Sequence, residues 1–411
     1  MTNKISAGST AGNITAESIG HEFERRYGAG ASVYTAPGRV NLIGEHTDYN
    51  MGFVLPAAVD KGIMVAIRPA AGPLSRIYSV DYDSEITLDL HGGESGSTKS
   101  GSTKSGDVPN DQWAKYIYGV AQEMATRGRS VGAVDAVFGG NVPLGAGMSS
   151  SAALESAFGF AFNEMFGLGF TLAELAVIGQ MTEHNWVGVR CGIMDQFISL
   201  HGRAGQVLKL DCRTLEFEYK PFSPAEHGYR LVLVDSMVKH NLSGGEYNER
   251  REQCEEGVRI VAAHHPEVQS LRDVSPEMLE RYRGEMPELV YRRCRYVVEE
   301  IARLVDGCDD LDAGRYEEFG ARMFETHRGL SQLFNVSTPE LDFIVDLARS
   351  TEGVAGARLM GGGFGGCVLH LIRCSVADAY LADVQAKFGA EFGLVPRIIE
   401  VVISDGARRL V

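Results

Sequence analysis

A glycine-rich turn that runs directly into a helix-favouring segment is the feature that most constrains the fold: Pro143-Leu144-Gly145-Ala146-Gly147-Met148-Ser149-Ser150-Ser151-Ala152-Ala153-Leu154-Glu155. Glycine adopts positive φ and lets backbone amides approach a ligand closely. The three serines stand where the helix begins, beside free N–H groups and the positive end of the helix dipole. This combination predicts an anion site suited to a nucleotide phosphate. A well-capped core helix after a turn is the alternative interpretation.

The turn differs from the Walker phosphate loop, because no Gly-Lys-Ser or Gly-Lys-Thr ends it. Serine hydroxyls, and not a lysine, therefore have to face the phosphates and any magnesium ion.

Composition limits the classes of protein to consider. A chain of 411 residues predicts two domains. With 39 Lys and Arg against 54 Asp and Glu, the net charge is −15, which argues against a nucleic-acid partner. The seven cysteines are scattered without a Cys-x-x-Cys pair, which predicts reduced thiols, no zinc site and a cytoplasmic protein. We also expect no signal peptide and no membrane span.

The N-terminal stretch predicts a short disordered segment, a helix and a strand. Residues 1 to about 14 are small and polar, which is typical of disorder. Residues 14–27 predict an amphipathic helix that Gly28 ends. Residues 33–36 predict a short strand that ends at Pro37-Gly38.

A second informative stretch follows at once: Gly38-Arg39-Val40-Asn41-Leu42-Ile43-Gly44-Glu45-His46-Thr47-Asp48-Tyr49-Asn50. We expect a glycine-flanked loop, which can turn the side chains of Arg39, Glu45, His46 and Asp48 toward one point. Carboxylates and an imidazole suit a polyol, whose hydroxyls both donate and accept hydrogen bonds. A solvated charged loop is the alternative.

The rest of the first half predicts an alternation of strands and helices. Strands are expected around 53–55, 62–67 and 134–138, and helices at 112–120, 150–166 and 171–183, the last with Thr171 as N-cap. Residues 92–107 contain Gly-Ser-Thr-Lys-Ser twice and predict a flexible surface loop. Trp113 and Tyr116 share a helix face, and spacing alone favours core packing for them. Asp195 stands among small and apolar residues, as either a hydrogen-bonded structural carboxylate or a poised base.

Beyond about residue 207 the pattern indicates a second α/β domain. Strands are predicted at 207–211 and 229–235, and long polar helices at 246–264 and 287–305. Gly361-Gly362-Gly363-Phe364-Gly365-Gly366 precedes a strand-like run, 367–372. Such a loop can approach another backbone or a ligand, or it can be a structural bend.

Three motifs follow one another in the order of a known family, and a further stretch also resembles that family. Residues 38–49 resemble the galactokinase signature, and Pro143 to Ala153 resemble the phosphate loop of the GHMP kinase superfamily. Leu359 to Gly366 are similar to the third, glycine-rich motif of that superfamily. Residues 191–196, Cys-Gly-Ile-Met-Asp-Gln, resemble the stretch with the galactokinase catalytic aspartate. The resemblance spans about residues 18–410.

The resemblance implies a two-domain α+β GHMP kinase fold with the active site in the cleft between the domains. The expected organisation is a disordered N-terminus (1–17), an N-terminal domain of the ribosomal-S5-domain-2 type that binds ATP and sugar (18–207, with the insert 92–107), and a ferredoxin-like C-terminal domain (208–411). The implied reaction transfers the γ-phosphoryl group of Mg-ATP to the anomeric 1-hydroxyl of α-D-galactose, the first committed step of the Leloir pathway.

The resemblance also implies roles for individual residues. Asp195 would be the catalytic base and Arg39 its cationic neighbour. The sugar would be bound by Glu45, His46, Asp48, Gly192, Asp195 and Tyr247. ATP would be bound by Gly145, Ala146, Gly147, Met148, Ser149, Ser150, Ser151 and Ala152, with Trp113 and Tyr116 on the adenine side. Magnesium would be held by Ser151 or Ser150 and by Glu183.

Two alternatives to galactokinase activity stay open at this point. One is a related sugar 1-kinase that acts on N-acetylgalactosamine, arabinose or galacturonate. The other is a sensor that binds galactose and ATP without catalysis. In each case the expected partners are small molecules, with no nucleic acid and no membrane, and the expected state is a monomer.

Overall fold

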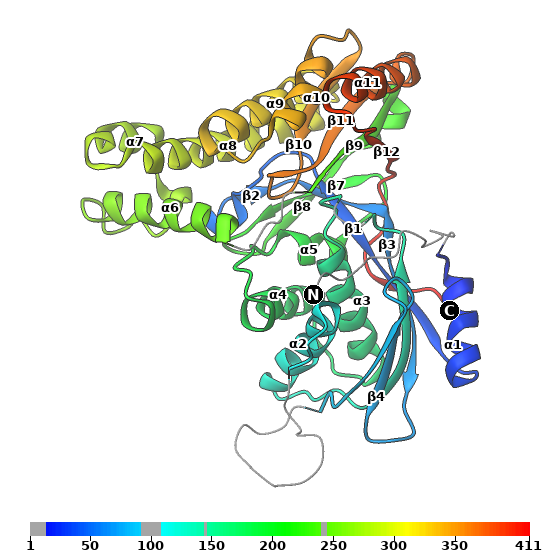
Figure 1. The fold of residues 1–411 in the computed structure, drawn as a ribbon. Helices are drawn as coiled ribbons and strands as arrows, with labels where there is room; N and C mark the ends of the chain where they lie inside the picture. Colours follow the sequence, from blue (N-terminus) through cyan, green and yellow to red (C-terminus); the bar gives the residue numbers. More distant parts are fainter. Residues whose placement is uncertain (1–13, 92–107, 144–145, 240–244) are drawn as a thin grey trace.

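The chain forms two α/β halves that meet along one broad contact. The computed structural model describes residues 14–91, 108–143, 146–239 and 245–411. In Figure 1 the N-terminal half, with α1 to α5, lies below, and the C-terminal half, with α8 to α11, lies above. Among the described residues, none of the helices has the length and apolar character needed to cross a membrane. Two segments expected to be disordered or flexible, 1–13 and the insert 92–107, lie outside the described residues.

The N-terminal half is built on a six-stranded sheet of order β13-β1-β3-β6-β4-β5. Its described neighbours pair antiparallel except for β4 and β6, which run parallel. The strands are β1 (Ser32–Asn41), β3 (Pro56–Pro69), β4 (Ser75–Ser79), β5 (Ser84–Leu88), β6 (Val134–Gly140) and β13 (Arg408–Arg409).

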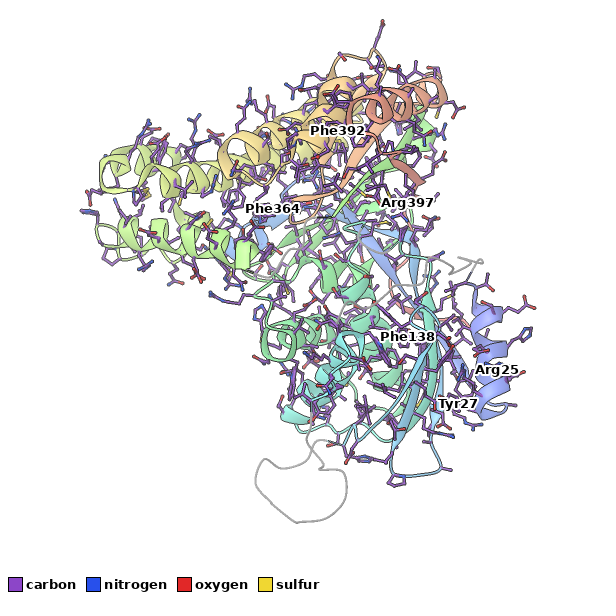
Figure 2. All side chains as sticks on the ribbon, viewed as in Figure 1. Arg25, Tyr27, Phe138, Phe364, Phe392 and Arg397 are labelled. Carbon is purple, nitrogen blue, oxygen red and sulfur yellow. The ribbon has the colours of Figure 1, made fainter. Side chains whose placement is uncertain are left out.

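Helices cover both faces of this sheet. On one face lies α1 (Ala16–Tyr27), which Thr15 caps and which buries Ile19 and Phe23. On the other lie α2 (Gln112–Thr126), α3 (Ser150–Met165), α4 (Leu172–Thr182) and α5 (Met194–His201). Figure 2 shows Phe138 on this inner face, where its ring contacts those of Trp113 and Phe158 at centroid distances of 5.3 and 5.7 Å.

The C-terminal half contains a four-stranded antiparallel sheet of order β10-β11-β9-β12. Its strands are β9 (Tyr229–Lys239), β10 (Val354–Leu359), β11 (Gly365–Arg373) and β12 (Arg397–Glu400). Its helices are α6 (Gly245–Ala262), α7 (Pro276–Arg281), α8 (Glu288–Asp312), α9 (Tyr316–Arg328), α10 (Pro339–Arg349) and α11 (Ala377–Phe392).

Alternation along β9 explains why this sheet is buried on both sides. Val232 and Val234 belong to the core beneath α8, α10 and α11, whereas Leu231 and Leu233 belong to the core shared with β1 and β3. Successive side chains of a strand point to opposite faces, so one apolar run serves both cores. The contact between the halves is therefore a continuous hydrophobic core.

The chain crosses between the halves more than once. A small sheet of β2 (Phe53–Val54), β7 (Gln206–Asp211) and β8 (Phe217–Pro221) joins the two, because β7 pairs with β2. At the C-terminus, β13 returns to pair with β1, and Figure 1 shows this end beside α1. The boundary at 207 stays a prediction, and α1 begins at Ala16, ahead of the boundary placed at 18.

Most predicted elements are confirmed, but several boundaries were wrong: the helices expected at 112–120 and 287–305 extend to Thr126 and Asp312. The expected strand 33–36 does not end at Pro37: β1 continues to Asn41, so Arg39 lies in a strand and not in a loop. The ladder between β1 and β3 shifts its register between Pro37 and Arg39. On the other edge of β1, β13 pairs with Tyr34 and Thr35 and does not reach Pro37. Because no strand lies beside Pro37 on that edge, its lack of an N–H group costs no hydrogen bond of the sheet.

Candidate active site

A cavity of about 400 Å³ lies at the junction of the two halves. Its walls come from β1, the loop after it, the glycine-rich turn, the segment before α5, α6 and the glycine loop before β11. The predicted site residues that line it are Arg39, Glu45, His46, Asp48, Tyr116, Gly147, Met148, Ser149, Ser150, Ser151, Glu183, Gly192, Asp195 and Tyr247. Residues more than 200 positions apart thus meet in one space.

The glycine-rich turn presents the start of α3 to this cavity. Gly147 has φ of +69° and Ser149 has φ of 56°, so the backbone reverses twice just before the helix begins at Ser150. Ser149 makes no side-chain cap bond to α3. Its hydroxyl instead donates a hydrogen bond to Oδ2 of Asp195. The first N–H groups of the helix are thereby left to an anion in the cavity.

Asp195, at the start of α5, is held by two elements of the N-terminal half. Arg39 donates from Nε to Oδ1 at 2.8 Å and from Nη2 to Oδ2 at 3.0 Å, a bidentate ion pair. The third nitrogen, Nη1, donates to the carbonyl oxygen of Gly147. Arg39 therefore links the carboxylate of Asp195 to the backbone of the glycine-rich turn through hydrogen bonds.

The loop after β1 is fixed from the C-terminal half. The backbone N–H of Gly44 donates to Glu300 Oε1 on α8 at 2.7 Å. Gly44 has φ of +94°, and a Cβ there would lie 2.6 Å from a methyl of Leu304. Only glycine fits this turn without strain, and the turn sends the next residues into the cavity.

His46 is a neutral imidazole at the cavity wall. Burial lowers the pKa of His46 to about 3. Its Nδ1 lies 2.7 Å from the Tyr49 hydroxyl and its Nε2 lies 3.3 Å from the Gly362 carbonyl. Because a carbonyl only accepts, Nε2 carries the proton and Nδ1 accepts from Tyr49. Its ring packs between Tyr247 and Phe334 at centroid distances of 5.5 and 4.6 Å.

Asp48, in the loop after β1, and Gly192, before α5, form a close contact. A Cβ at Gly192 would lie 1.8 Å from Asp48 Oδ2, so this glycine gives room to the carboxylate. Burial, followed by the nearby negative charge of Asp195, raises the pKa of Asp48 to about 7. At neutral pH Asp48 is thus able to donate as well as accept hydrogen bonds.

Glu183 and Ser151 meet in the cavity wall near the start of α3. Glu183 begins a one-turn π-helix (Glu183–Val187) that follows α4. Burial raises the pKa of Glu183 to about 7, and a hydrogen bond from Ser151 opposes that rise. The described residues contain no group of three His, Cys, Asp or Glu side chains that could hold a metal ion. One carboxylate with hydroxyls suits Mg²⁺, which takes most of its ligands from phosphates and water.

Some predicted ATP residues do not reach the cavity wall. Trp113 is buried in the N-terminal core against Phe138, whereas Tyr116, one turn later, lines the cavity. Ala146 and Ala152 are buried in the cores that support the turn and α3. Gly145 lies outside the described residues, as do 240–244, most of the stretch that identified Tyr247 as a sugar residue.

The structure also adds contacts that sequence reasoning missed. Glu155, one turn after Ser151 on α3, accepts a hydrogen bond from Gln196 Nε2 at 3.0 Å. Gln196 directly follows Asp195, so this bond anchors α5 to α3. A Cβ at Gly179 of α4 would lie 2.8 Å from Gln196. The sequence did contain a signal for this contact: Glu155 follows Ser151 by four positions, so the two side chains lie on the same face of α3.

Comparison with known families identifies three matching regions. The galactokinase galactose-binding signature matches residues 21–69, the GHMP kinases N terminal domain matches 115–203 and the GHMP kinases C terminal domain matches 308–390. The first region contains the loop after β1, and the second contains the phosphate turn and Asp195.

Curated relatives and solved structures agree with these regions. The chain is 38% identical to a galactokinase of Roseiflexus sp. (strain RS-1), over 94% of this chain and 95% of that protein. It is 40% identical to a galactokinase of Chloroflexus aggregans, over 90% and 92%. A crystal structure of Lactococcus lactis galactokinase complexed with galactose superposes with a TM-score of 0.87 at 28% identity, covering 96% and 99% of the two chains. A mevalonate kinase shares the fold, with a TM-score of 0.59 at 18% identity, over 91% and 99%.

Proposed function

The chain belongs to the galactokinase family of ATP-dependent sugar kinases, and on that premise we propose which groups of its cavity perform the transfer to galactose. The family's reaction moves the γ-phosphoryl group of ATP to the anomeric 1-hydroxyl of α-D-galactose. The bond from the sugar oxygen to phosphorus forms, the bond from phosphorus to the bridging oxygen of ADP breaks, and the hydroxyl proton has to be taken up.

Asp195 is the group proposed to take that proton. It is the carboxylate that Arg39 and Ser149 hold at the cavity wall. Phosphoryl transfer has a loose transition state, so the protein mainly positions groups and neutralises charge. Arg39 serves both needs: it fixes the direction of the carboxylate, and its cation lies where charge on the migrating group requires it. This bidentate pair, between β1 and the start of α5, is the observation that carries the proposal.

Galactose is proposed to bind on the side of the loop after β1. Glu45, His46, Asp48, Gly192 and Tyr247 supply the polar groups there. A neutral imidazole at His46 and a carboxyl group at Asp48 whose pKa is raised to about 7 offer both donors and acceptors, which is what sugar hydroxyls need.

ATP is proposed to bind with its phosphates at the start of α3. The backbone of the turn and the hydroxyls of Ser149, Ser150 and Ser151 face that end of the cavity. Tyr116 lies on the same side, and the role of Trp113 on the adenine side stays a proposal that its buried position does not favour.

Magnesium is the divalent ion proposed for the phosphates. Ser151, or Ser150, together with Glu183 would hold it. When bound, the ion neutralises phosphate charge. The carboxylate of Glu183 gives up its proton to serve as ligand, since metal ligands are deprotonated.

The remaining expectations also stay proposals. All seven cysteines, each within the described part of the chain, are free thiols, which supports a reducing, cytoplasmic setting. That the enzyme works as a monomer also stays a proposal. The partners proposed are the two small-molecule substrates alone.

The test is ATP consumption with magnesium against a panel of acceptors: galactose, glucose, N-acetylgalactosamine, arabinose, galacturonate, mevalonate and homoserine. We expect turnover to be led by galactose and to be lost without magnesium. Turnover led by another sugar would contradict the assignment of Glu45, His46 and Asp48. Saturable galactose binding without turnover on any acceptor would indicate a sensor.

A further inference from the structure

Arg358 is a fully buried arginine on β10, three residues before the glycine loop. Its exposed fraction is 0%. Its Nη2 donates to the carbonyl oxygen of Asn41 at 2.6 Å and to Oε1 of Glu45. Within the described part of the chain, Nε and Nη1 of Arg358 have no hydrogen-bond partner. A buried cation with unpaired N–H groups is costly, so its presence calls for a reason other than local stability.

The carboxylate of Glu45 is held by one of its two oxygens. Oε1 accepts from the Gly361 N–H at 2.8 Å and from Arg358. Among the described residues, no side-chain or backbone donor is directed to Oε2, and Glu45 lines the cavity whereas Arg358 does not. The arrangement fixes one oxygen in the protein and leaves the other for a ligand.

We propose that Arg358 is a positioning residue of the sugar site, which holds Oε1 of Glu45 in place and turns its Oε2 toward the cavity without touching the sugar itself. This inference rests on the proposed function, because it takes Glu45 as a ligand of galactose. It explains why the arginine is buried at the end of β10, where the halves of the molecule meet. Nε and Nη1 of Arg358 stay unpaired because the guanidinium is oriented so that Nη2 reaches both Glu45 and the Asn41 carbonyl at the end of β1.

Arg358 is the cation that pairs with the Glu45 carboxylate. Within the described residues, two other cations near this part of the cavity bond elsewhere: Arg39 to Asp195, and Arg250, whose charge acts on His46, to the carbonyl oxygens of Phe334 and Asn335. Tyr296 donates to the backbone carbonyl of Glu45 at 3.0 Å, not to its carboxylate. Removal of Arg358 would therefore leave the Gly361 N–H as the one described donor to Oε1, and the carboxylate could turn away from the cavity.

The test is Arg358→Met, assayed for kcat and KM of each substrate from pH 6 to pH 9. We expect kcat/KM for galactose to fall about 10- to 100-fold across this pH range. The KM for ATP should change by less than about twofold, because the glycine-rich turn is untouched.

Arg397→Met is the matched control. Arg397 donates to the buried carboxylate of Asp235 at 2.6 Å, and neither residue lines the cavity. This variant removes an arginine from a buried carboxylate elsewhere in the same sheet, so we expect its galactose parameters to match those of the wild type.

Two further variants keep the inference testable if Arg358→Met does not fold. Glu45→Gln combined with Arg358→Met removes both charges, and it should fold and bind ATP while its galactose affinity, measured by calorimetry, stays at least tenfold below that of the wild type. Arg358→Lys retains the charge but loses the planar guanidinium that donates to both Glu45 and the Asn41 carbonyl. Its KM for galactose should lie between those of the wild type and Arg358→Met.

Three outcomes would overturn the inference. They are wild-type galactose kinetics in Arg358→Met, an equal loss in the galactose and ATP parameters at every pH, and wild-type galactose affinity in the double variant. If the wild-type chain itself turned over no galactose, the proposed function would fail, and that failure would be recognisable before any variant is compared.

Discussion

Arg39 donates a hydrogen bond to each carboxylate oxygen of Asp195, with Nε 2.8 Å from Oδ1 and Nη2 3.0 Å from Oδ2. The arginine lies in β1 and the aspartate opens α5, 156 positions later. Because Nη1 of Arg39 also donates to the Gly147 carbonyl oxygen, one cation joins the carboxylate of Asp195 to the glycine-rich turn. In the proposed mechanism this turn binds ATP and Asp195 faces the sugar hydroxyl, so the relative placement of the two substrates depends on this one side chain.

Asp195→Ala is expected to abolish turnover while ATP binding stays nearly intact. The carboxylate contacts the reacting hydroxyl in the proposed mechanism, and a positioned general base contributes about 10²–10⁴-fold. ATP affinity, measured by calorimetry with magnesium, should change by less than about threefold, because the turn and α3 hold the phosphates without it. A large loss of ATP affinity would contradict the role given to Asp195.

Arg39→Lys is expected to lower kcat by about 10- to 100-fold. A lysine carries the charge but has no planar fork, so it cannot hold both oxygens of Asp195 and the Gly147 carbonyl together. Arg409→Lys, at an exposed arginine of β13 outside the cavity, is the control and should behave as the wild type. Steady-state kinetics for both substrates checks this, and wild-type kcat in Arg39→Lys would remove its proposed role.

Much of this site could be predicted from local sequence, because glycine turns and helix starts are local features. The start of α3 and the strand before it are confirmed, since their signals lie within a few residues of each element. The continuation of β1 through Pro37 was missed. A proline fits there because β13, some 370 residues later in the chain, is too short to pair with β1 at that position. Arg358 and Glu155 were missed for the same reason: their importance depends on partners that only the tertiary fold brings to them.

Gly192→Ala is expected to raise the KM for galactose at least tenfold with little change in the KM for ATP. Its Cβ would lie 1.8 Å from Asp48 Oδ2, so the carboxylate or the segment before α5 has to move. Gly284→Ala is the matched control, since a Cβ there meets nothing within 4 Å. Unchanged galactose kinetics in Gly192→Ala would show that Asp48 is free to move without loss of binding.

Asp48→Asn is expected to stabilise the fold at pH 8 and to lose that advantage in acid. The pKa of Asp48 is raised to about 7 in the folded state, above its ordinary value of 3.8. The folded state therefore binds the proton more tightly than the unfolded state, so the wild type gains stability as pH falls from about 7 toward 4. The amide mimics the protonated acid, and the difference should be about 1–3 kcal/mol at pH 8. Urea unfolding at pH 8 and pH 4.5 measures it, and an equal difference at both pH values would contradict the shift.

Glu183→Gln is expected to raise the magnesium concentration needed for half-maximal turnover by about tenfold or more, with galactose affinity unchanged. Glu183 is the carboxylate beside Ser151 at the phosphate end of the cavity, and a neutral amide is a much weaker ligand for a hard cation. The same residue gives a pH signature: because its pKa is raised to about 7, protons compete with the metal below neutrality, so the wild type should need more magnesium at pH 6 than at pH 8. That dependence should be weaker in Glu183→Gln, which has no proton to release. A magnesium titration at both pH values separates a ligand from a residue that only supports the fold, since the latter would lower turnover without moving the half-maximal concentration.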